Sequence, residues 1–268
     1  MNRTLPLLPV MLLLLLHAFV PEADAEPAAR EIMERQQDRH ALENEESTIV
    51  VLLVDAKGNQ QKRTLKRWSK ELEDGLYRTL IVFREPEDIA GTALLTWQLE
   101  GGRSKQWLHL PGQETLRRIA GQGRKSYFMG TDFTFEDLQP DAMEDYRYVL
   151  KGSEEVDGEP CHVIEITPAS REKERESAYG RRVAWIRKDI LYPLKIEFYD
   201  RRGRRIKTQT NHELTPLTGE AWAARKALMT HHQTGHKTLM GLKSCVTDRP
   251  VEDDLFTERF LLTGRHLQ

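Results

Sequence analysis

Two groups of side chains in this sequence could do chemistry, a run of carboxylates and a group of histidines. The carboxylates are Asp132, Glu136, Asp137, Asp141, Glu144 and Asp145. Paired carboxylates can serve general acid–base chemistry, and clustered ones can bind calcium. Their spacing does not match the D-x-D-x-D-G calcium loop, and it favours a polar loop in which these side chains cap helices and turns.

The histidines of interest are His231, His232 and His236. Adjacent residues of a strand point to opposite faces, so at most one of the first two could join His236 across a turn. A third zinc ligand would have to come from elsewhere, such as His212, and exposed or edge histidines are the favoured interpretation. The sequence has no G-x-S-x-G elbow, Walker loop or dinucleotide fingerprint. We therefore predict a protein that is not an enzyme and that has no cofactor or metal.

Residues 1–25 have the pattern of a secretory signal peptide. Arg3 precedes an apolar run centred on residues 12–16, and small residues occupy the positions before a cleavage site after Ala25. An uncleaved membrane anchor is the alternative, but Pro6 and Pro9 leave too short an apolar run for a span of about 20 residues. We expect an exported mature protein, with residues 26–268 forming a single domain.

Two cysteines, Cys161 and Cys245, lie far apart in the sequence. An exported protein meets an oxidising compartment, in which disulfides form and persist. A disulfide between them and two separate buried thiols both remain open. Neither cysteine belongs to a C-x-x-C pattern, and two cysteines alone cannot hold zinc.

The charge of the chain is nearly balanced, with 40 Lys and Arg against 42 Asp and Glu. This balance gives no indication of a nucleic-acid partner. A local basic cluster brackets a turn and consists of Arg201, Arg202, Arg204, Arg205 and Lys207. Solvated charge on a hairpin is the favoured interpretation, and contact with an anionic lipid or a partner is the alternative.

The elements that must position these side chains are mostly strands. From residue 47 onward apolar side chains recur with a period of two, for example in residues 77–83 and 93–99. Turn signals separate the strands at residues 101–102, 157–158, 200–203 and 234–235. We predict about ten or eleven strands in an antiparallel meander, with a charged helix at residues 28–45 and a short helix at 253–262.

Strands with one apolar face need only one side covered, and about ten of them curl under their own twist into a barrel or half-barrel. The inside of a wide, incompletely closed barrel is either filled by a plug or left as a ligand cavity. The sequence therefore predicts a mainly β (α+β) fold, a curved antiparallel sheet that forms an incomplete barrel.

The stretch YFMGTDFTFEDL at residues 127–138 combines aromatic side chains with Gly and Asp. We predict a short aromatic strand that bends at Gly130 and Asp132 around the edge of the sheet. With the tryptophans of the preceding hairpin, Trp97 and Trp107, it indicates a curved apolar surface that binds an apolar ligand. Ordinary core packing is the alternative for each aromatic side chain taken alone. An apolar trough can hold an acyl chain without a special polar group, since each buried CH₂ contributes about 0.8 kcal/mol.

In their order along the chain, several short motifs resemble the LolA-like family of outer membrane lipoprotein-sorting proteins from Gram-negative bacteria, over about residues 60 to 245. They are FREP (83–86), GTA (91–93), WLHLP (107–111), RRI (117–119), SYFMGTDF (126–133), EDL (136–138), DG (157–158) before Cys161, YPLK (192–195) and YDRRG (199–203). The resemblance implies a periplasmic half-barrel lidded by helices, with an apolar cavity for acyl chains.

The same resemblance implies a non-enzymatic carrier of lipids or lipoproteins, and a membrane permease of the resistance-nodulation type as a partner. A sensor of lipid or of envelope stress on the same fold is the alternative function. We predict that Leu95, Trp97, Ile196 and Phe198 line the concave face. The full set of expected cavity residues is Ile81, Phe83, Leu95, Trp97, Leu108, Leu110, Phe133, Phe135, Trp185, Ile196 and Phe198.

Overall fold

A computed structural model of the chain describes residues 22–73 and 75–267. Most of the predicted signal peptide, residues 1–21, lies outside these described residues. None of the helices in the described ranges is both long and apolar enough to span a bilayer. The helices are α1 (Glu22–Arg39), α2 (Arg171–Glu176) and α3 (Glu258–Leu262).

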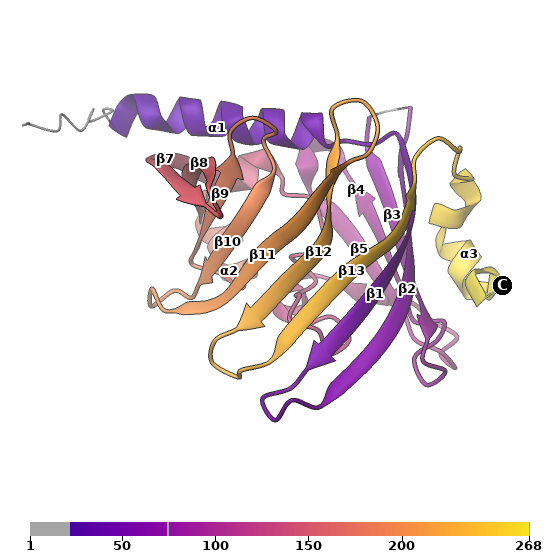
Figure 1. Cartoon of the computed structure of the whole chain (residues 1–268). Helices are drawn as coiled ribbons and strands as arrows, with labels where there is room; N and C mark the ends of the chain where they lie inside the picture. The colour runs from indigo at the N-terminus through magenta and orange to yellow at the C-terminus, as the bar shows by residue number, and fades with distance from the viewer. Residues whose placement is uncertain (1–21, 74, 268) are drawn as a thin grey trace, which may run out of the picture.

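The described residues form one antiparallel sheet of 13 strands (Figure 1). The strands are β1 (Asn44–Val54), β2 (Gln60–Glu71), β3 (Tyr77–Glu85), β4 (Ala93–Gln98), β5 (Ser104–His109), β6 (Arg117–Ile119), β7 (Tyr146–Val156), β8 (Glu159–Pro168), β9 (Arg181–Arg187), β10 (Pro193–Tyr199), β11 (Arg205–Pro216), β12 (Trp222–His231) and β13 (Lys237–Val246). Each strand pairs with the next along the chain, except that β6 does not pair with β7, and these two strands form the edges of the sheet. In addition, β1 pairs with β13. The predicted fold class is therefore confirmed, with more strands than expected.

The predicted turns connect the strands at the expected places. Residues 101–102, 157–158 and 203 lie in the β4–β5, β7–β8 and β10–β11 connections, and Gly235 lies in the β12–β13 hairpin. Asp157 and Gly158 both have positive φ, 52° and 81°, which is the geometry of a two-residue hairpin turn. The sequence predicted fewer strands than the structure has, because an element as short as the three-residue β6 shows no periodicity.

Helix α1 ends earlier than the predicted helix at residues 28–45. Asn44 already belongs to β1, where it pairs with Lys70 of β2. The apolar side of α1 packs Ala29 and Met33 onto β7–β9 side chains that include Tyr148. The helix lies across one end of the curved sheet, as the expected lid does (Figure 1).

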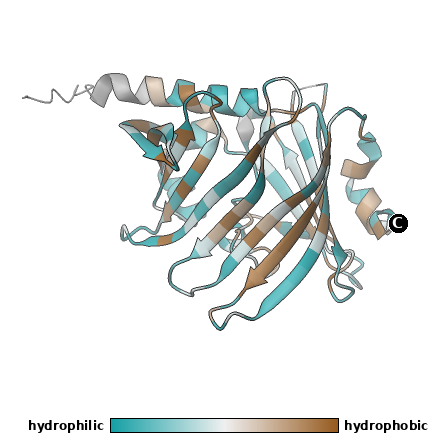
Figure 2. Ribbon diagram, in the orientation of Figure 1, coloured by the Kyte–Doolittle hydropathy of each residue, from teal (hydrophilic) through white to brown (hydrophobic). Residues whose placement is uncertain are grey.

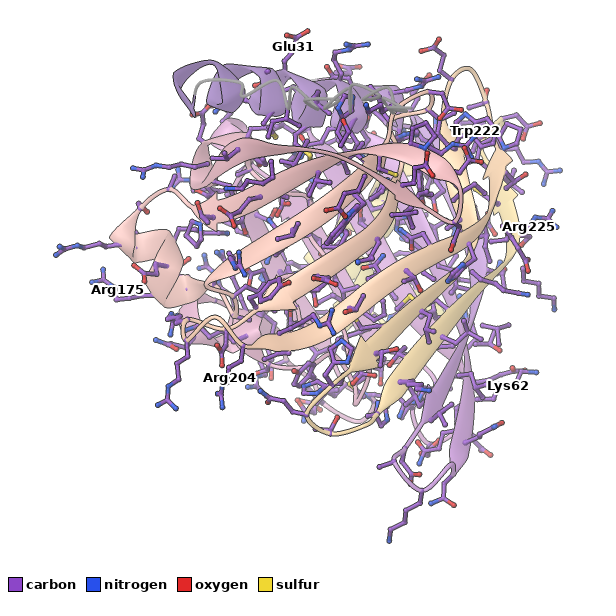
Figure 3. The ribbon with its side chains drawn as sticks, turned by 60° about the vertical axis from the view of Figure 1, so that its left-hand side comes forward. Glu31, Lys62, Arg175, Arg204, Trp222 and Arg225 are labelled. Atoms are coloured by element: carbon purple, nitrogen blue, oxygen red, sulfur yellow. The ribbon has the colours of Figure 1, made fainter. Side chains whose placement is uncertain are left out.

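Each strand of the β2–β5 half has one face inside the curve and one outside. Leu65, Phe83 and Leu94 point inward and share a buried cluster with Val51 of β1. The outer face packs under the C-terminal segment, and this outer cluster joins Trp68, Leu80, Val82, Ala93, Leu95 and Trp107 to Val251, Phe256 and Leu261. Figure 2 shows the apolar run of β1 beside the more hydrophilic β2. Charged side chains such as Lys62, Arg204 and Arg225 point into solvent (Figure 3).

The predicted C-terminal helix at residues 253–262 is two short pieces. A 3₁₀ turn covers Asp253–Phe256, and α3 follows it. Thr257 separates them and caps α3, since its side chain accepts a hydrogen bond from Phe260 N at 3.1 Å.

The predicted aromatic strand at residues 127–138 is wrong. Apart from an isolated bridge between Tyr127 and Thr134, this stretch forms no strand. Met129 and Gly130 both have positive φ, 49° and 75°, and such a pair reverses the chain within a few residues. Residues 126–140, called the plug segment below, lie in the connection between the two sheet edges. They fold into the concave side, where Phe128 packs on Phe83.

Candidate functional site

The concave side of the sheet contains two adjoining cavities, of about 440 and 460 Å³. The first lobe lies over β1–β4 and reaches the plug segment. The second lobe lies over β1 and β11–β13 and reaches α1. Cavities of this size accommodate small-molecule ligands. The side chains that line both lobes are His40, Leu42, Glu45, Ile49, Arg67 and Met240.

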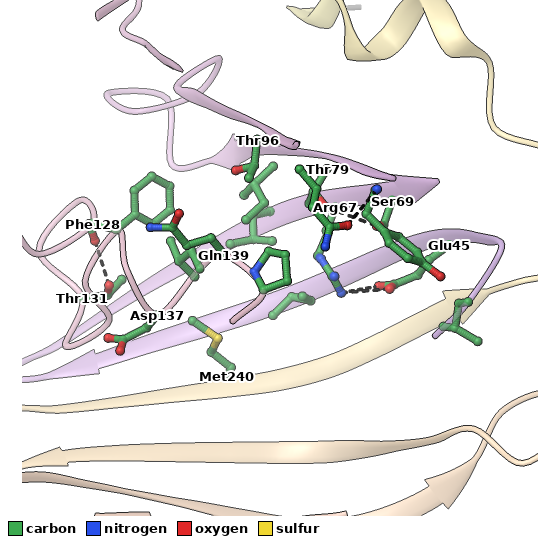
Figure 4. A pocket seen from close by; sticks show the side chains of 18 of the residues that line it. Glu45, Arg67, Ser69, Thr79, Thr96, Phe128, Thr131, Asp137, Gln139 and Met240 are labelled. Atoms are coloured by element: carbon green, nitrogen blue, oxygen red, sulfur yellow. Dashed lines mark hydrogen bonds and ion pairs between the residues drawn. The ribbon is translucent and has the colours of Figure 1, made fainter. Parts of the chain in front are cut away.

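The first lobe is mainly apolar. Ile81 and Phe83 of β3 and Val51 of β1 form its wall, because the inner positions of neighbouring strands fall in register. Phe128 and Leu138 of the plug segment cover one end. Figure 4 shows this end of the lobe, with Phe128, and the opposite end. At the opposite end Arg67 forms an ion pair with Glu45.

The Arg67–Glu45 pair is the main electrostatic feature of the lining. Nη1 of Arg67 lies 2.9 and 2.8 Å from the two carboxylate oxygens of Glu45. Ser47 Oγ donates a further hydrogen bond to Glu45, at 2.6 Å. The Glu45 side chain is only 10% exposed and that of Arg67 is 37% exposed. The carboxylate is therefore well satisfied, while the guanidinium faces the cavity.

Buried polar contacts anchor the plug segment to the opposite side of the sheet. Lys207 of β11 is completely buried, and its Nζ donates to Asp137 Oδ2 at 2.5 Å and to Asp132 O at 2.9 Å. Tyr179 also donates to Asp137, at 2.9 Å. Burial, with the nearby Asp137 charge, raises the pKa of Tyr179 well above its usual value, so this phenol stays protonated as a donor. The ring of Phe198 lies 4.7 Å from Nζ, within cation–π range.

The histidines of the β12–β13 hairpin also contact this segment or its surroundings. His236 Nδ1 lies 2.7 Å from Asp132 Oδ2, and His231 Nε2 lies 2.9 Å from the Tyr127 hydroxyl. His232 contacts Thr208 on the exposed side. Within residues 22–73 and 75–267, no group of three or more His, Cys, Asp or Glu side chains could hold a metal ion.

The remaining carboxylates of the acidic run are mostly ion-paired. Asp141 binds Arg182 at 2.8 Å, Glu144 binds Arg30 of α1 at 2.6 Å and Asp145 binds Lys173 at 3.2 Å. Glu136 accepts from Tyr146 Oη and Ala178 N, at 3.1 and 2.7 Å. Asp137 accepts from Thr134 N at 2.7 Å, which is a turn contact. The run is thus a polar loop, as predicted, and Asp137 makes a turn contact, but the other carboxylates join the plug segment and the following turn to distant elements rather than capping helices.

The expected cavity residues fall into three groups. Ile81 and Phe83 line the first lobe, and Leu108, Leu110 and Phe135 belong to the apolar cluster beneath it. Phe133, Ile196 and Phe198 pack on the concave side near Lys207 without lining either lobe. The third group, Leu95, Trp97 and Trp185, lies on the outer face.

For the third group the prediction is wrong. Trp97 Nε1 donates to Phe256 O at 2.8 Å, so the C-terminal segment covers this face of β4. Trp185 packs with Cys161 in a separate outer cluster, and Lys195 Nζ lies 3.7 Å from the Trp185 ring centroid. The more apolar face of β4, with Ala93, Leu95 and Trp97, is the outer one, whereas Leu94, Thr96 and Gln98 lie on the inner face. The period separates the two faces, and only the tertiary packing shows which of them is the inner one.

Sequence reasoning missed most polar lining residues, including Arg67, Glu45 and Thr79. Thr79 carries a usable signal, because it shares its face of β3 with Ile81 and Phe83. Arg67 and Glu45 carry none, because they meet only through the pairing of β1 with β2. Their side chains become cavity residues through strand register.

The two thiols are free, so the disulfide alternative is wrong. Cys161 is buried on β8, and Cys245 is half-buried on β13. Four strands separate β8 from β13 in the sheet, which is too far for the Cα separation of about 4.4–6.8 Å in a disulfide. The second lobe is lined by Cys245.

The predicted solvated basic cluster is correct only in part. Arg204 and Arg205 lie at the hairpin and pair with Asp200 and Glu197, at 2.8 and 2.7 Å. Lys207 is instead the buried anchor of the plug segment. Alternation alone does not explain the difference, because Arg205 and Lys207 are two residues apart and would share a face. The pairing of β10 with β11 shifts register between them, so that Lys207 pairs with Phe198 and Arg205 with Tyr199. Lys207 is buried, whereas the arginines at the turn are exposed.

The curved open sheet, its lid helix and its trough define a LolA-like half-barrel. The structure is similar to a domain assigned to outer membrane lipoprotein sorting from Vibrio parahaemolyticus, with 29% identity, a TM-score of 0.81, and 88% of this chain and 99% of that chain covered. It is similar to a DUF1329 family protein from Desulfovibrio piger at 29% identity and a TM-score of 0.82, again with 88% and 99% covered. A LolA superfamily protein from Nitrosomonas europaea shares the fold at 19% identity and a TM-score of 0.68, over 87% and 98% of the chains.

A protein-family model described as "uncharacterized protein" matches residues 75–263, which is most of the chain. No curated protein matches this chain. The chain belongs to the family of that model, and it shares the LolA-like fold with the structural neighbours above.

Proposed function

We propose that this protein is a periplasmic carrier that binds lipids or lipoproteins and shields their acyl chains in the trough. The observation that carries the proposal is the pair of adjoining cavities on the concave face, with an apolar wall around Ile81 and Phe83. The similarity to a lipoprotein-sorting domain supports the same class of ligand. The signal peptide predicted at residues 1–25 supports export to the periplasm.

Apolar burial supplies the affinity in this proposal. Ten methylenes transferred from water into the trough contribute about 8 kcal/mol, at about 0.8 kcal/mol for each CH₂. Loss of translational freedom and ordering of the chain offset part of this gain. The binding requires no reacting group, and we therefore propose a binding protein rather than an enzyme.

Passing a ligand to or from a membrane requires a partner there. The family resemblance supports a permease of the resistance-nodulation type as that partner. Lipid transfer between vesicles with and without the purified permease's periplasmic domain tests this part. A transfer rate that does not respond to that domain would contradict the partnership and leave lipid binding untouched.

The test of lipid binding is native mass spectrometry of the protein purified from the periplasm, followed by extraction of bound lipid. We expect a co-purified acyl ligand, and weaker uptake of lipid by the Met240→Gln variant. Met240 lines both lobes, and an amide of similar length would place a polar group against the acyl chain, at a cost of about 1–3 kcal/mol.

The matched control is Leu262→Gln, at a side chain on α3 that is 52% exposed and outside both lobes. Thermal unfolding of both variants establishes that they are folded. The proposal fails if no acyl ligand co-purifies and none is taken up from vesicles, or if folded Met240→Gln takes up lipid as well as Leu262→Gln does.

A further inference from the structure

The two lobes of the trough diverge from a common strip of side chains. One extends from β1 across β2, β3 and β4, and the other extends from β1 in the opposite direction, across β13, β12 and β11. The strip between them includes His40 and Leu42 of the α1–β1 connection and Ile49 of β1. The lobes are also nearly equal in volume, about 440 and 460 Å³. This shape suits a ligand with two apolar branches that meet at one point.

A cation lies at the point where the branches would meet. Arg67 lines both lobes, and its contact with Glu45 uses only Nη1. Among the described residues no hydrogen bond is made by its Nη2 or Nε, so N–H groups remain that can donate to a ligand oxygen. A guanidinium presents its donors in a planar fork that matches phosphate and carboxylate oxygens.

The other two titratable side chains of the strip, His40 and Glu45, already form contacts within the protein. His40 Nε2 lies 3.1 and 3.2 Å from the carbonyl oxygens of Ile190 and Leu191. Its Nδ1 accepts from Trp222 N at 3.1 Å. The Glu45 carboxylate is held by Arg67 and Ser47. Arg67 is therefore the group of the strip with donors left for a ligand.

We propose that the trough binds an anionic two-chain amphiphile, with one acyl chain in each lobe and the anionic head at Arg67. This inference rests on the proposed lipid-binding function and names its substrate class. A single long chain threaded through both lobes would bring its apolar middle against the ion pair. The apolar middle would exclude water from the charged groups and offer them no hydrogen bond in return. A branched amphiphile places its polar junction there and its chains on the apolar walls.

The experiment uses the delipidated protein and three lipids of matched acyl length. Phosphatidylglycerol has two chains and a negative head, lysophosphatidylglycerol has one chain and the same head, and phosphatidylcholine has two chains and a zwitterionic head. Native mass spectrometry gives the stoichiometry and a fluorescence titration gives the affinity. Alkylation of Cys245 reports on the second lobe, because Cys245 lines it and Cys161 is buried on the outer face.

We expect one phosphatidylglycerol per protein, with alkylation of Cys245 slowed by about tenfold or more at saturation. Phosphatidylcholine has the same phosphate oxygens, but its quaternary ammonium cancels the net negative charge of the head and is repelled by the Arg67 cation. It should therefore bind about tenfold more weakly, a difference of about 1.4 kcal/mol. Lysophosphatidylglycerol should also bind more weakly by at least about tenfold, since one lobe stays without a chain.

Two variants test the role of the cation, and neither leaves the buried Glu45 carboxylate without its partner. The double variant Glu45→Gln with Arg67→Gln should lose the preference for phosphatidylglycerol over phosphatidylcholine. The single variant Glu45→Gln keeps the cation and should retain that preference. Thermal unfolding confirms that both variants are folded, and a second neutral double variant, Glu45→Gln with Arg67→Met, replaces the first if it is not.

Three results would overturn the inference while leaving the proposed function intact. These are equal affinity for the one-chain and two-chain lipids, unchanged alkylation of Cys245 with bound phosphatidylglycerol, and a head-group preference that survives in the neutral double variant. Failure of all three lipids to bind would instead overturn the proposed function itself.

Discussion

Replacing Lys207 by Met should destabilise the protein far more than any surface charge change. The Lys207 side chain is 0% exposed and its partner Asp137 is 6% exposed, at an N–O distance of 2.5 Å. Methionine fills a similar volume but leaves the Asp137 carboxylate buried without its cation. Loss of one partner of a buried ion pair costs about 3–5 kcal/mol. The nearby ring of Phe198 also loses a cation–π contact, worth about 0.5–2 kcal/mol.

The chain offers a matched control in an exposed pair of the same geometry. Lys226 and Glu213 are also 2.5 Å apart, but both side chains are 52% exposed. Lys226→Met should therefore change the free energy of unfolding by no more than about 1 kcal/mol. The contrast is mainly one of burial, since the substituted residue, the N–O distance and the carboxylate character of the partner are the same in the two pairs.

A double variant separates the ion pair from the packing of the methionine. Asp137→Asn removes the charge and retains one oxygen, which at the Oδ2 position can accept from both Thr134 N and Tyr179 Oη. Combined with Lys207→Met, it should recover most of the stability lost in the single variant, because no buried charge remains. Urea unfolding followed by tryptophan fluorescence gives the free energy of unfolding of the unchanged protein, of Lys207→Met, of Lys226→Met and of the double variant. The reasoning is refuted if Lys207→Met costs no more than Lys226→Met, or if the double variant is no more stable than Lys207→Met alone.

Three further predictions concern other parts of the chain. Gly180→Ala should cost about 1–3 kcal/mol in a urea titration, because its Cβ would lie 2.8 Å from a backbone oxygen; Gly241→Ala, where the nearest atom is 3.8 Å away, is the comparison and should cost less. Ellman's reagent should find two thiols in denaturant and at most one slowly reacting thiol, Cys245, in the folded protein, since Cys161 is buried; a count of zero in denaturant would restore the disulfide. Burial lowers the pKa of His40, although the hydrogen bonds of its ring to the backbone carbonyls of Ile190 and Leu191 oppose this shift. Between that lowered pKa and the unfolded value of about 6.5 the unfolded chain binds more protons, so stability should fall from pH 7 to pH 5.5, and an equal fall in His40→Gln would contradict this assignment.

The general architecture could be predicted because its signals are local. A strand alternates over a few residues, and a turn such as Asp157-Gly158 is specified by the residues that form it. Each of these signals gave the correct hairpin. The end of α1 was placed too late, since helical and extended conformations compete near residue 44 and the pairing with β2 decides between them.

The plug segment could not be predicted in the same way. Its aromatic content is typical of a strand, but Met129 and Gly130 adopt left-handed conformations. These conformations are stabilised by contacts with side chains far along the chain, such as Lys207 to Asp137 and Thr238 to Asp132. A propensity calculated from neighbouring residues contains no information about such partners.

The location of the trough follows from which parts of the concave face remain uncovered. Phe128 and the rest of the plug segment cover one end, and α1 covers the other, so the inner side chains between them, such as Ile49 and Met240, line open space. On the outer face of β4 the C-terminal segment leaves no such space around Leu95. Alternation separates the two faces of β4, and the more apolar of them, with Leu95 and Trp97, is the one that the C-terminal segment covers. Only this tertiary cover determines which face can receive a ligand. A polar residue placed at Leu95 should therefore impair folding, whereas one placed at Met240 should impair lipid binding.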